Sequence, residues 1–553
     1  MILKESDILK SNTFIQGAFI ATFGIIISKI LGIIYVIPFY VIIGEQGGAL
    51  YGYAYSLYNI FLAISTIGLP IAVSKIVSEY NTLGYYNCKE RAYKIALKII
   101  IIMSIISFLI LFICAPLLAQ IIMGNVTGGN SKEDITLVLR VSSLAIIFVA
   151  TLSVLRGYLQ GHKFITPSSI SQIIEQLARV ILIIFGSYVA LKIFRLGLPV
   201  AVSVAVFGAT FGAIIAVFYL KYKIKRNKKN LKTNYQESIK EGNITNRQIL
   251  KKLLKYSLPL VAISVITSSY EIVDTMTVVK TLVNDTGFNT IDAEAVISVI
   301  STWGSKLNMI VTSVASGIIV SLIPNITSSN VSNNKKDVGN KINQTIQMIL
   351  LISLPMTIGL SFLAVPVWGI FYGYESIGPL VIKFSIFTAF TACLSTSMIM
   401  IAQALNEYKL VLISLVSGIT LKIVLNVPLM ILFNKISLPP YYGAITATII
   451  GSLTVTIFNL IWIGCKRKIN YINTLKQSGL VLLSCFTMVI IMYGTTYILP
   501  LNIEKRFISI IVVIIYTIVG GLSYLFVAHK TNIIKQTFGN NIYNKIPIIR
   551  KYL

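Results

Sequence analysis

The chain has 553 residues, of which 56% are hydrophobic and 12% are charged, and its mean hydropathy is +0.82. Soluble proteins have about a quarter of their residues charged, so this composition excludes a water-soluble globular protein. The formal net charge of +28 comes from short Lys and Arg clusters between apolar runs, a pattern that argues against nucleic acid as a partner.

Apolar runs of about 20 residues or more, long enough to cross a bilayer, recur along the whole chain. They predict an all-α integral membrane protein with about 14 transmembrane helices. The first run is too long for a signal peptide and should remain as the first helix. The five cysteines and two histidines show no metal-ligand or catalytic spacing, so we expect no metal, no cofactor and no enzymatic activity. The predicted spans are 13–43, 51–79, 92–122, 135–160, 167–193, 198–221, 253–282, 293–325, 341–371, 379–405, 409–434, 440–464, 476–499 and 507–529.

Lys and Arg accumulate on alternate connections between the predicted helices, which is typical of cytoplasmic loops. Both termini of this multi-pass membrane protein should therefore be cytoplasmic. Exceptions occur near Lys192, Lys435 and Lys505. The basic segments are 89–94, 163, 221–255, 335–336, 409, 466–468 and 530–551.

Three segment pairs recur in the same order at a separation of about 250 residues, which indicates an internal repeat. In the first pair, Gly68 and Gly317 lie at the same distance from Asn59 and Asn308; the other two pairs are the segments that end at Gly124 and Gly373 and those that end at Lys163 and Lys409. Because each unit would hold an even number of helices, both halves should insert in the same direction, as parallel transporter repeats do. The expected regions are a six-helix N-lobe over 1–221, a basic cytoplasmic linker over 222–251, a six-helix C-lobe over 252–464, and two further helices with a basic cytoplasmic tail over 465–553.

Lysines inside the predicted spans are candidates for substrate binding, because an ion at membrane depth tends to face a wet cavity or a counter-ion. Lys29 and Lys306 lie deep in the first and eighth spans and should face a central cavity, with a structural ion pair as the alternative. Lys280 lies nearer a helix end and could instead be an interface anchor. Glu175 and Arg179, four residues apart, are expected to pair with each other, with a role in substrate binding as the alternative. Deep cations favour an anionic substrate such as a pyrophosphate.

Two acids, Glu271 and Asp274, share one face of the seventh span, and Lys422 shares a face of the eleventh span with Asn426. Two interpretations stay open for these residues. One is a structural ion pair between Asp274 and Lys422. The other is a cation or proton site coupled to transport.

Four segments carry a resemblance to a known family: SKILG at 28–32, GLPIAVSKIVSEYNTLGYY at 68–86, EIVDTMTVVKTL at 271–282, and 308–324. They resemble the stage V sporulation protein B branch of the polysaccharide biosynthesis families. These belong to the multidrug/oligosaccharidyl-lipid/polysaccharide (MOP) flippase superfamily, whose lipid II flippases are similar in helix count. The resemblance covers the first to about the twelfth span. It implies alternating access and movement of undecaprenyl-pyrophosphate saccharides from the inner to the outer leaflet, for peptidoglycan or polysaccharide synthesis.

The resemblance also implies site residues. Ser28 and Lys29 match a Ser-Arg pair in the first helix of lipid II flippases, and Lys306 matches an arginine of their eighth helix. Tyr35 stands where a second cavity arginine would fall. Lys422 falls near the position at which some relatives bind sodium. The expected central-cavity residues are Ser28, Lys29, Tyr35, Asn59, Lys280, Lys306 and Asn308.

Two other functions remain as alternatives. A multidrug or cation antiporter of the same superfamily should place acids in its cavity, whereas a non-transporting scaffold for cell-wall or spore-cortex synthesis would not need deep lysines. The expected partners are a lipid-linked anionic saccharide, membrane lipids and, for some roles, cell-wall synthesis proteins. We expect a monomer. The sequence leaves the glycan and the energy source open.

Overall fold

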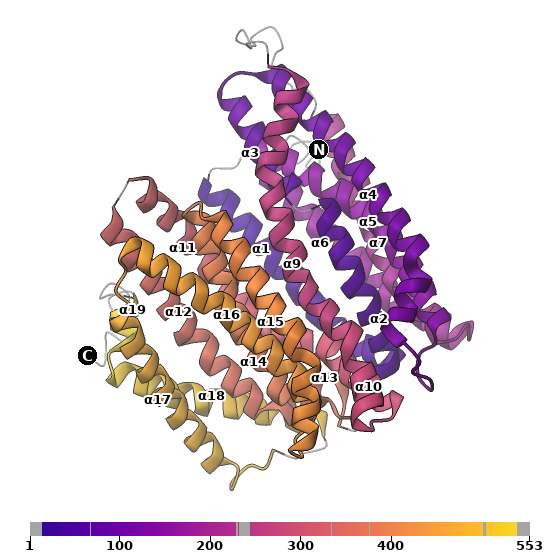
Figure 1. Ribbon diagram of the computed structural model, residues 1–553, viewed down its shortest axis with the longest axis vertical. Coiled ribbons are helices and arrows are strands. Elements are labelled where there is room, and N and C mark those ends of the chain that lie inside the picture. Colours follow the sequence, from indigo (N-terminus) through magenta and orange to yellow (C-terminus); the bar gives the residue numbers. More distant parts are fainter. Residues whose placement is uncertain are drawn as a thin grey trace, which may run out of the picture. The chain divides into compact units, whose positions relative to one another are not determined.

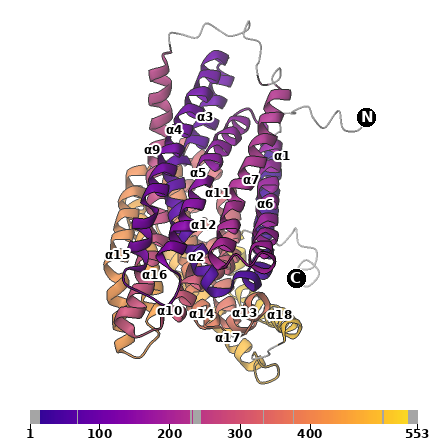
Figure 2. The ribbon, with the colours of Figure 1, turned by 90° about the vertical axis from the view of Figure 1, so that its right-hand side faces the viewer.

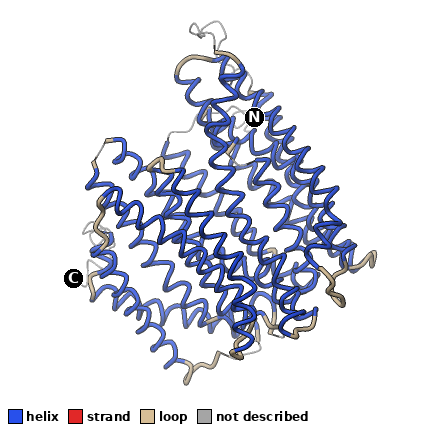
Figure 3. Tube along the Cα trace, in the orientation of Figure 1, coloured by secondary structure: helices blue, strands red, loops and turns tan. Residues whose placement is uncertain are grey.

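The fold is helical throughout the part of the chain that the structure describes (Figure 3). This structure is a computed structural model that describes residues 14–66, 68–227, 231, 244–332, 334–374, 376–501 and 505–538. The expected all-α membrane fold is confirmed. Within these residues 12 helical segments are long and apolar enough to cross a membrane. The long helices Phe14–Ile34 and Asn246–Thr286 are not among them, so the number 14 stays a prediction.

The chain divides into two compact units, Met1–Lys280 and Thr281–Leu553 (Figure 1). The first contains α1 (Phe14–Ile34), α2 (Val36–Thr66), α3 (Leu69–Thr82), α4 (Tyr86–Met123), α5 (Lys132–Gly161), α6 (Ile165–Ile181), the π-helical turns η1 (Leu182–Gly186) and η2 (Val189–Ile193), α7 (Leu198–Arg226) and most of α9 (Asn246–Thr286). The second contains α10 (Thr290–Ser298), η4 (Val299–Trp303), α11 (Gly304–Val331), α12 (Lys335–Phe362), α13 (Ala364–Tyr372), α14 (Gly378–Ala404), α15 (Tyr408–Lys435), α16 (Tyr441–Arg467), α17 (Ile472–Thr495), α18 (Arg506–Lys530) and α19 (Ile533–Phe538).

Helix α9 begins in the expected C-lobe but packs mainly within the first unit. Lys252 near its start forms a salt bridge with Glu79 of α3 at 2.6 Å between Nζ and Oε1. The expected lobe boundaries stay predictions. Most of the expected linker over 222–251, and the expected tail beyond Phe538, lie outside the described residues.

The first helices break at one predicted place and at one that was not predicted. The predicted end of the first span at residue 43 coincides with a kink at Gly44, which has φ 63° and ψ −162°, but α2 resumes directly after it in place of the expected loop up to residue 50. The expected second span is instead divided after Thr66. There Gly68 has φ 94°, and Pro70 occupies the first turn of α3, where its missing N–H costs nothing. Apolar periodicity detects helix, but it does not locate a break made by one glycine with positive φ.

The packing order of the helices recurs in the two units, in agreement with the expected repeat. In the first unit α5 contacts α2, α4 and α7, and α6 contacts α7. In the second unit α14 contacts α11, α12 and α16, and α15 contacts α16. Figures 1 and 2 show α4, α5 and α7 running beside one another in both views.

Helix ends support one of the three sequence matches and correct another. Gly124 and Gly373 both end a helix with positive φ, at 58° and 96°. The turn after α5 places Lys163 at φ 62°, and the turn after α14 places Asn406 at φ 62°. These turns have the same hydrogen-bond pattern, so Lys163 corresponds to Asn406 and not to the expected Lys409. The sequence match is therefore three residues out of register. It aligned two lysines, whereas the two turns correspond in their backbone conformation.

Gly68 and Gly317, matched in the sequence, have different surroundings. A Cβ at Gly68 would lie 2.6 Å from the carbonyl oxygen of Ser257, whereas nothing lies within 4 Å of a Cβ at Gly317 in α11. Gly68→Ala should therefore destabilise the protein by about 2 kcal/mol or more, through the positive φ and the clash. Gly317→Ala should stabilise it by about 0.5 to 1 kcal/mol. Apparent melting temperatures in detergent test this contrast, and an equal decrease for both variants would contradict it.

Candidate functional site

In the first unit, the expected cavity residues begin on α1. Ser28 donates its hydroxyl to the Gly24 carbonyl one turn earlier, at 2.9 Å. Lys29 follows it and is half-buried. Tyr35, between α1 and α2, is 5% exposed and packs on Phe39 with ring centroids 6.0 Å apart. The structure thus places Tyr35 in a buried aromatic cluster, while the substrate roles of Ser28, Lys29 and Tyr35 stay predictions.

Helix α9 brings its acidic residues toward α2. Asn59 on α2 donates its side-chain amide to the carboxylate of Glu271, with 3.4 Å between Nδ2 and Oε2. One turn further along α9, Thr275 donates to Ser56 at 3.0 Å, and both hydroxyls are buried. Asp274, 8% exposed, lies beside Thr275. Asn59 and Glu271, which the sequence analysis assigned to two separate sites, are therefore in contact.

Lys280 has a contact that supports its structural interpretation. Its Nζ donates to the carbonyl of Ile121 at 2.9 Å. This carbonyl belongs to the last turn of α4, where carbonyls have no intrahelical donor and a cation is favourable. The side-chain stem packs over Gly124, whose Cβ would lie 3.2 Å from Cδ of Lys280. Lys280 therefore caps α4, and its role in substrate binding stays a prediction.

The first unit also contains an ion pair that the sequence analysis missed. Arg156 of α5 pairs with Glu175 of α6 at 2.8 Å, and each side chain is 16% exposed. The Nε of Arg156 also donates to Ser171 at 2.8 Å. The expected pairing of Glu175 with Arg179 is wrong, because α5 brings a better-placed cation to the same carboxylate. The sequence did contain an indication of this ion pair, because Arg156 and Glu175 lie in consecutive spans that a short turn joins.

Arg179 instead belongs to a tyrosine cluster. Its guanidinium donates to the hydroxyl of Tyr55 on α2 and lies 5.3 Å from the centre of that ring. Tyr51 stacks on Tyr55 with centroids 4.4 Å apart, and Tyr58 contacts Tyr55 edge-on at 5.6 Å. Hydrogen bonding and cation–π attraction together stabilise this cation within the apolar helix bundle.

Close packing of α6 on α7 holds both networks in place. A Cβ at Gly212 would lie 2.4 Å from the carbonyl oxygen of Glu175, and one at Gly208 would lie 3.1 Å from that of Arg179. The two glycines are four residues apart, a spacing that lets membrane helices approach closely. Helix α6 can therefore present its charged side chains to α5 and α2.

In the second unit, Lys306 and Asn308 lie near the start of α11, directly after the π-helical turn η4. Such turns are frequent at functional sites. Lys306 is half-buried. Asn308 donates its amide to the hydroxyl of Thr388 on α14, at 3.4 Å. The structure thus positions Asn308 against a neighbouring helix, and the predicted substrate contacts of both residues remain predictions.

Lys422 and Asn426 lie inside the second unit and are completely buried. The ammonium of Lys422 donates to the hydroxyl of Thr448 on α16 at 2.6 Å. Helices α15 and α16 approach closely because Gly443 carries no side chain, and a Cβ there would lie 2.3 Å from the backbone nitrogen of Met430. The pairing of Lys422 with Asp274 and the coupled-ion alternative both stay predictions.

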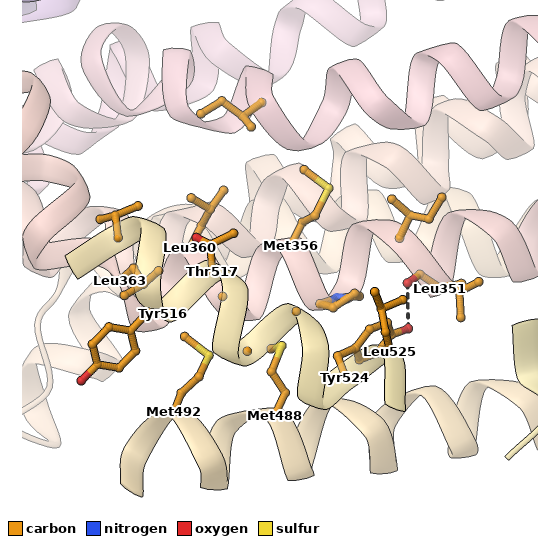
Figure 4. Close-up of a pocket in the computed structure, with 17 residues that line it drawn as sticks. Leu351, Met356, Leu360, Leu363, Met488, Met492, Tyr516, Thr517, Tyr524 and Leu525 are labelled. Atoms are coloured by element: carbon orange, nitrogen blue, oxygen red, sulfur yellow. Dashed lines mark hydrogen bonds between the residues drawn. The ribbon is translucent and has the colours of Figure 1, made fainter. Parts of the chain in front are cut away.

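An apolar cavity of about 440 Å³ lies between α12, α17 and α18 (Figure 4). Gly359 and Gly520 leave room in its wall, and Met488 and Met492 point toward it from α17. At one end Tyr524 donates its hydroxyl to the Leu351 carbonyl at 2.7 Å. Its lining can hold a hydrocarbon chain but offers little to a polar ligand.

Comparison with known proteins shows the family. Residues 14–329 match the family described as polysaccharide biosynthesis protein. The chain is 32% identical to the lipid II flippase MurJ of Bacillus subtilis (strain 168), over 96% of this chain and 98% of that protein. It is 27% identical to stage V sporulation protein B of the same organism, over 32% of each chain.

Two solved structures share the fold. One is a lipid II flippase MurJ in an inward closed conformation, with TM-score 0.62, 17% identity, and coverage of 94% of this chain and 99% of that one. The other is an inward-facing multidrug resistance MATE family transporter of the MOP superfamily, with TM-score 0.59, 16% identity, and coverage of 80% and 94%. The chain is thus a multi-pass membrane protein that belongs to the polysaccharide biosynthesis protein family.

Proposed function

We propose that the protein is a flippase that moves an undecaprenyl-pyrophosphate-linked saccharide from the inner to the outer leaflet of a bacterial cell membrane. The observation that carries this proposal is the 32% identity to a lipid II flippase over nearly the full length of both chains. A flippase moves its substrate without making or breaking covalent bonds. The proposed protein is therefore a transporter, not an enzyme.

The charged side chains of the spans support an anionic substrate. Lys29 and Lys306 are half-buried within apolar helices of their respective units. The carboxylate of Glu175 is already neutralised by Arg156. A lysine offers a pyrophosphate a compact positive charge, without the two-pronged geometry of arginine. In this proposal Lys29 and Lys306 bind the pyrophosphate during alternating access.

The apolar cavity between α12, α17 and α18 supports a lipid-linked cargo. Its methionine and leucine side chains adapt to a flexible hydrocarbon chain. Within the proposal, part of the polyprenyl tail occupies this cavity while the headgroup is moved. The basic loop segments support an orientation with both termini in the cytoplasm. The proposal takes the protein to work as a monomer.

The proposal is tested in bacterial cells depleted of their own lipid II flippase. Expression of this protein should restore growth and the appearance of lipid II in the outer leaflet, measured by labelling from outside the cell. Resistance to cationic drugs should not change, because the cavity is proposed to bind anions. Failure to restore outward movement at equal membrane abundance would exclude lipid II as the cargo. Raised drug resistance instead would favour the antiporter alternative.

A further inference from the structure

A second cavity, of about 630 Å³, lies in the second unit at the starts of α12 and α17 and beside α19. Its chemistry differs from that of the apolar cavity, because most of its lining consists of carboxamide side chains. The residues that matter here are Asn343, Gln344, Gln347, Lys476, Gln477 and Gln536. Amide side chains both donate and accept hydrogen bonds, so this cluster at one end of three helices favours a ligand with many hydrogen-bonding groups.

Several amides are fixed in the wall by hydrogen bonds. Gln347 donates to the hydroxyl of Thr474 at 3.0 Å, and Thr474 donates to Asn343 at 2.9 Å. Gln477 donates through its Nε2 to Gln536 of α19 at 2.9 Å. These contacts hold the side chains in one arrangement, which reduces the entropy lost when a ligand binds.

The most informative atom is the carbonyl oxygen of Gln477. The side chain is 7% exposed and lines the cavity, and this oxygen accepts no hydrogen bond from the described residues. A buried acceptor is costly unless a donor satisfies it. A phosphate diester has acceptors alone and cannot satisfy it, whereas a hydroxyl group both donates and accepts. The sole lysine of the lining, Lys476, is exposed, so charge does not dominate the site.

The cavity lies where spanning helices start, beside a lipid-facing surface. Helix α12 begins at Lys335 and α17 at Ile472, so the amides lie within about the first four turns of α12 and the first two turns of α17. Leu480 of α17 lines the cavity, and Leu483, one turn further along the same helix face, is 50% exposed. Leu483 lies about 9 Å beyond Gln477 along the helix axis. A polar cavity with these leucines beside it matches an amphiphile with a hydroxyl-rich head.

We propose that this cavity is a saccharide-binding site that holds the sugar headgroup of a membrane glycolipid, with its acyl chains along α17. The uncharged hydroxyls of the sugar pair with the wall amides, and one of them donates to the Gln477 carbonyl. The site is separate from the lysines proposed to bind pyrophosphate. The test of this site measures lipid binding and not transport. The glycolipid proposal can therefore fail while the proposed flippase function stands, and the flippase function can fail while the glycolipid site stands.

The test is lipid retention by the purified full-length protein, measured by native mass spectrometry with diglucosyl diacylglycerol and, separately, phosphatidylglycerol. We expect preferential retention of the glycolipid. Asn340 of α12 also lines the cavity and is exposed. Gln477→Leu and Asn340→Ala should each lower that retention, by about tenfold for Gln477→Leu. Lys476→Ala should change it little. Gln120→Ala, which removes an exposed amide on α4 outside the cavity, is the matched control.

Three outcomes would overturn the proposal. Equal retention of phosphatidylglycerol, lost in Lys476→Ala, would show an anionic headgroup site. Unchanged glycolipid retention in both amide variants would show that the glycolipid binds elsewhere. Competition by soluble maltose as strong as by the glycolipid would show a site for free sugars and not for a lipid. Asn340→Ala keeps the test valid if Gln477→Leu does not fold, because Asn340 is exposed.

Discussion

Replacement of Lys29 or Lys306 with alanine is expected to lower outward movement of lipid II by about tenfold or more, in the cells used to test the proposed function. Each variant removes one charged contact to the pyrophosphate from an apolar environment, where such contacts are stronger than in water. Lys29→Arg and Lys306→Arg should keep activity, because arginine preserves the charge and adds a two-pronged donor. The measurement is external labelling of lipid II at equal membrane abundance.

Lys435→Ala is the matched control for the lysine variants. Lys435 ends α15 and is exposed, so its loss should leave translocation unchanged. Wild-type activity in both Lys29→Ala and Lys306→Ala would remove these residues from the substrate site, although the flippase proposal would stand. Loss of activity in the arginine variants as well would indicate that the lysines act through shape or packing and not through charge.

Glu175→Gln is expected to destabilise the protein by about 3 kcal/mol, because it leaves the Arg156 guanidinium buried without a carboxylate. The pair is 16% exposed on each side, so solvent does little to replace the lost partner. The double variant Arg156→Met with Glu175→Leu should recover most of the loss, since it removes both charges and keeps apolar volume. Apparent melting temperatures in detergent measure these differences.

The salt bridge between Lys466 and Glu407 provides the control for this prediction. Its side chains are 52% and 21% exposed, so Glu407→Gln should cost less than about 1 kcal/mol. If Glu175→Gln and Glu407→Gln lowered the melting temperature equally, burial would not explain the importance of the Arg156 pair. A double variant no more stable than Glu175→Gln would show that the charges contribute beyond mutual neutralisation.

The amino-acid sequence by itself determined the membrane class, the helical fold and the family. Run length and hydrophobicity suffice for the first two, because a helix is the local structure that satisfies its own backbone in lipid. The sequence also identified Lys29 and Lys306 as unusual, since a charge inside an apolar run stands out without any knowledge of its neighbours. It did not locate the break at Gly68, where one residue with positive φ divides an apolar run.

The tertiary structure decided which groups meet. Glu175 lies four residues from Arg179 in the sequence, yet it pairs with Arg156, because the approach of α5 to α6 places that guanidinium closer. Lys280 caps α4 because the end of that helix lies beside α9. The carboxamide cavity exists because α12, α17 and α19 bring their polar ends together. Contacts between distant segments depend on helix packing, which periodicity within one helix does not encode.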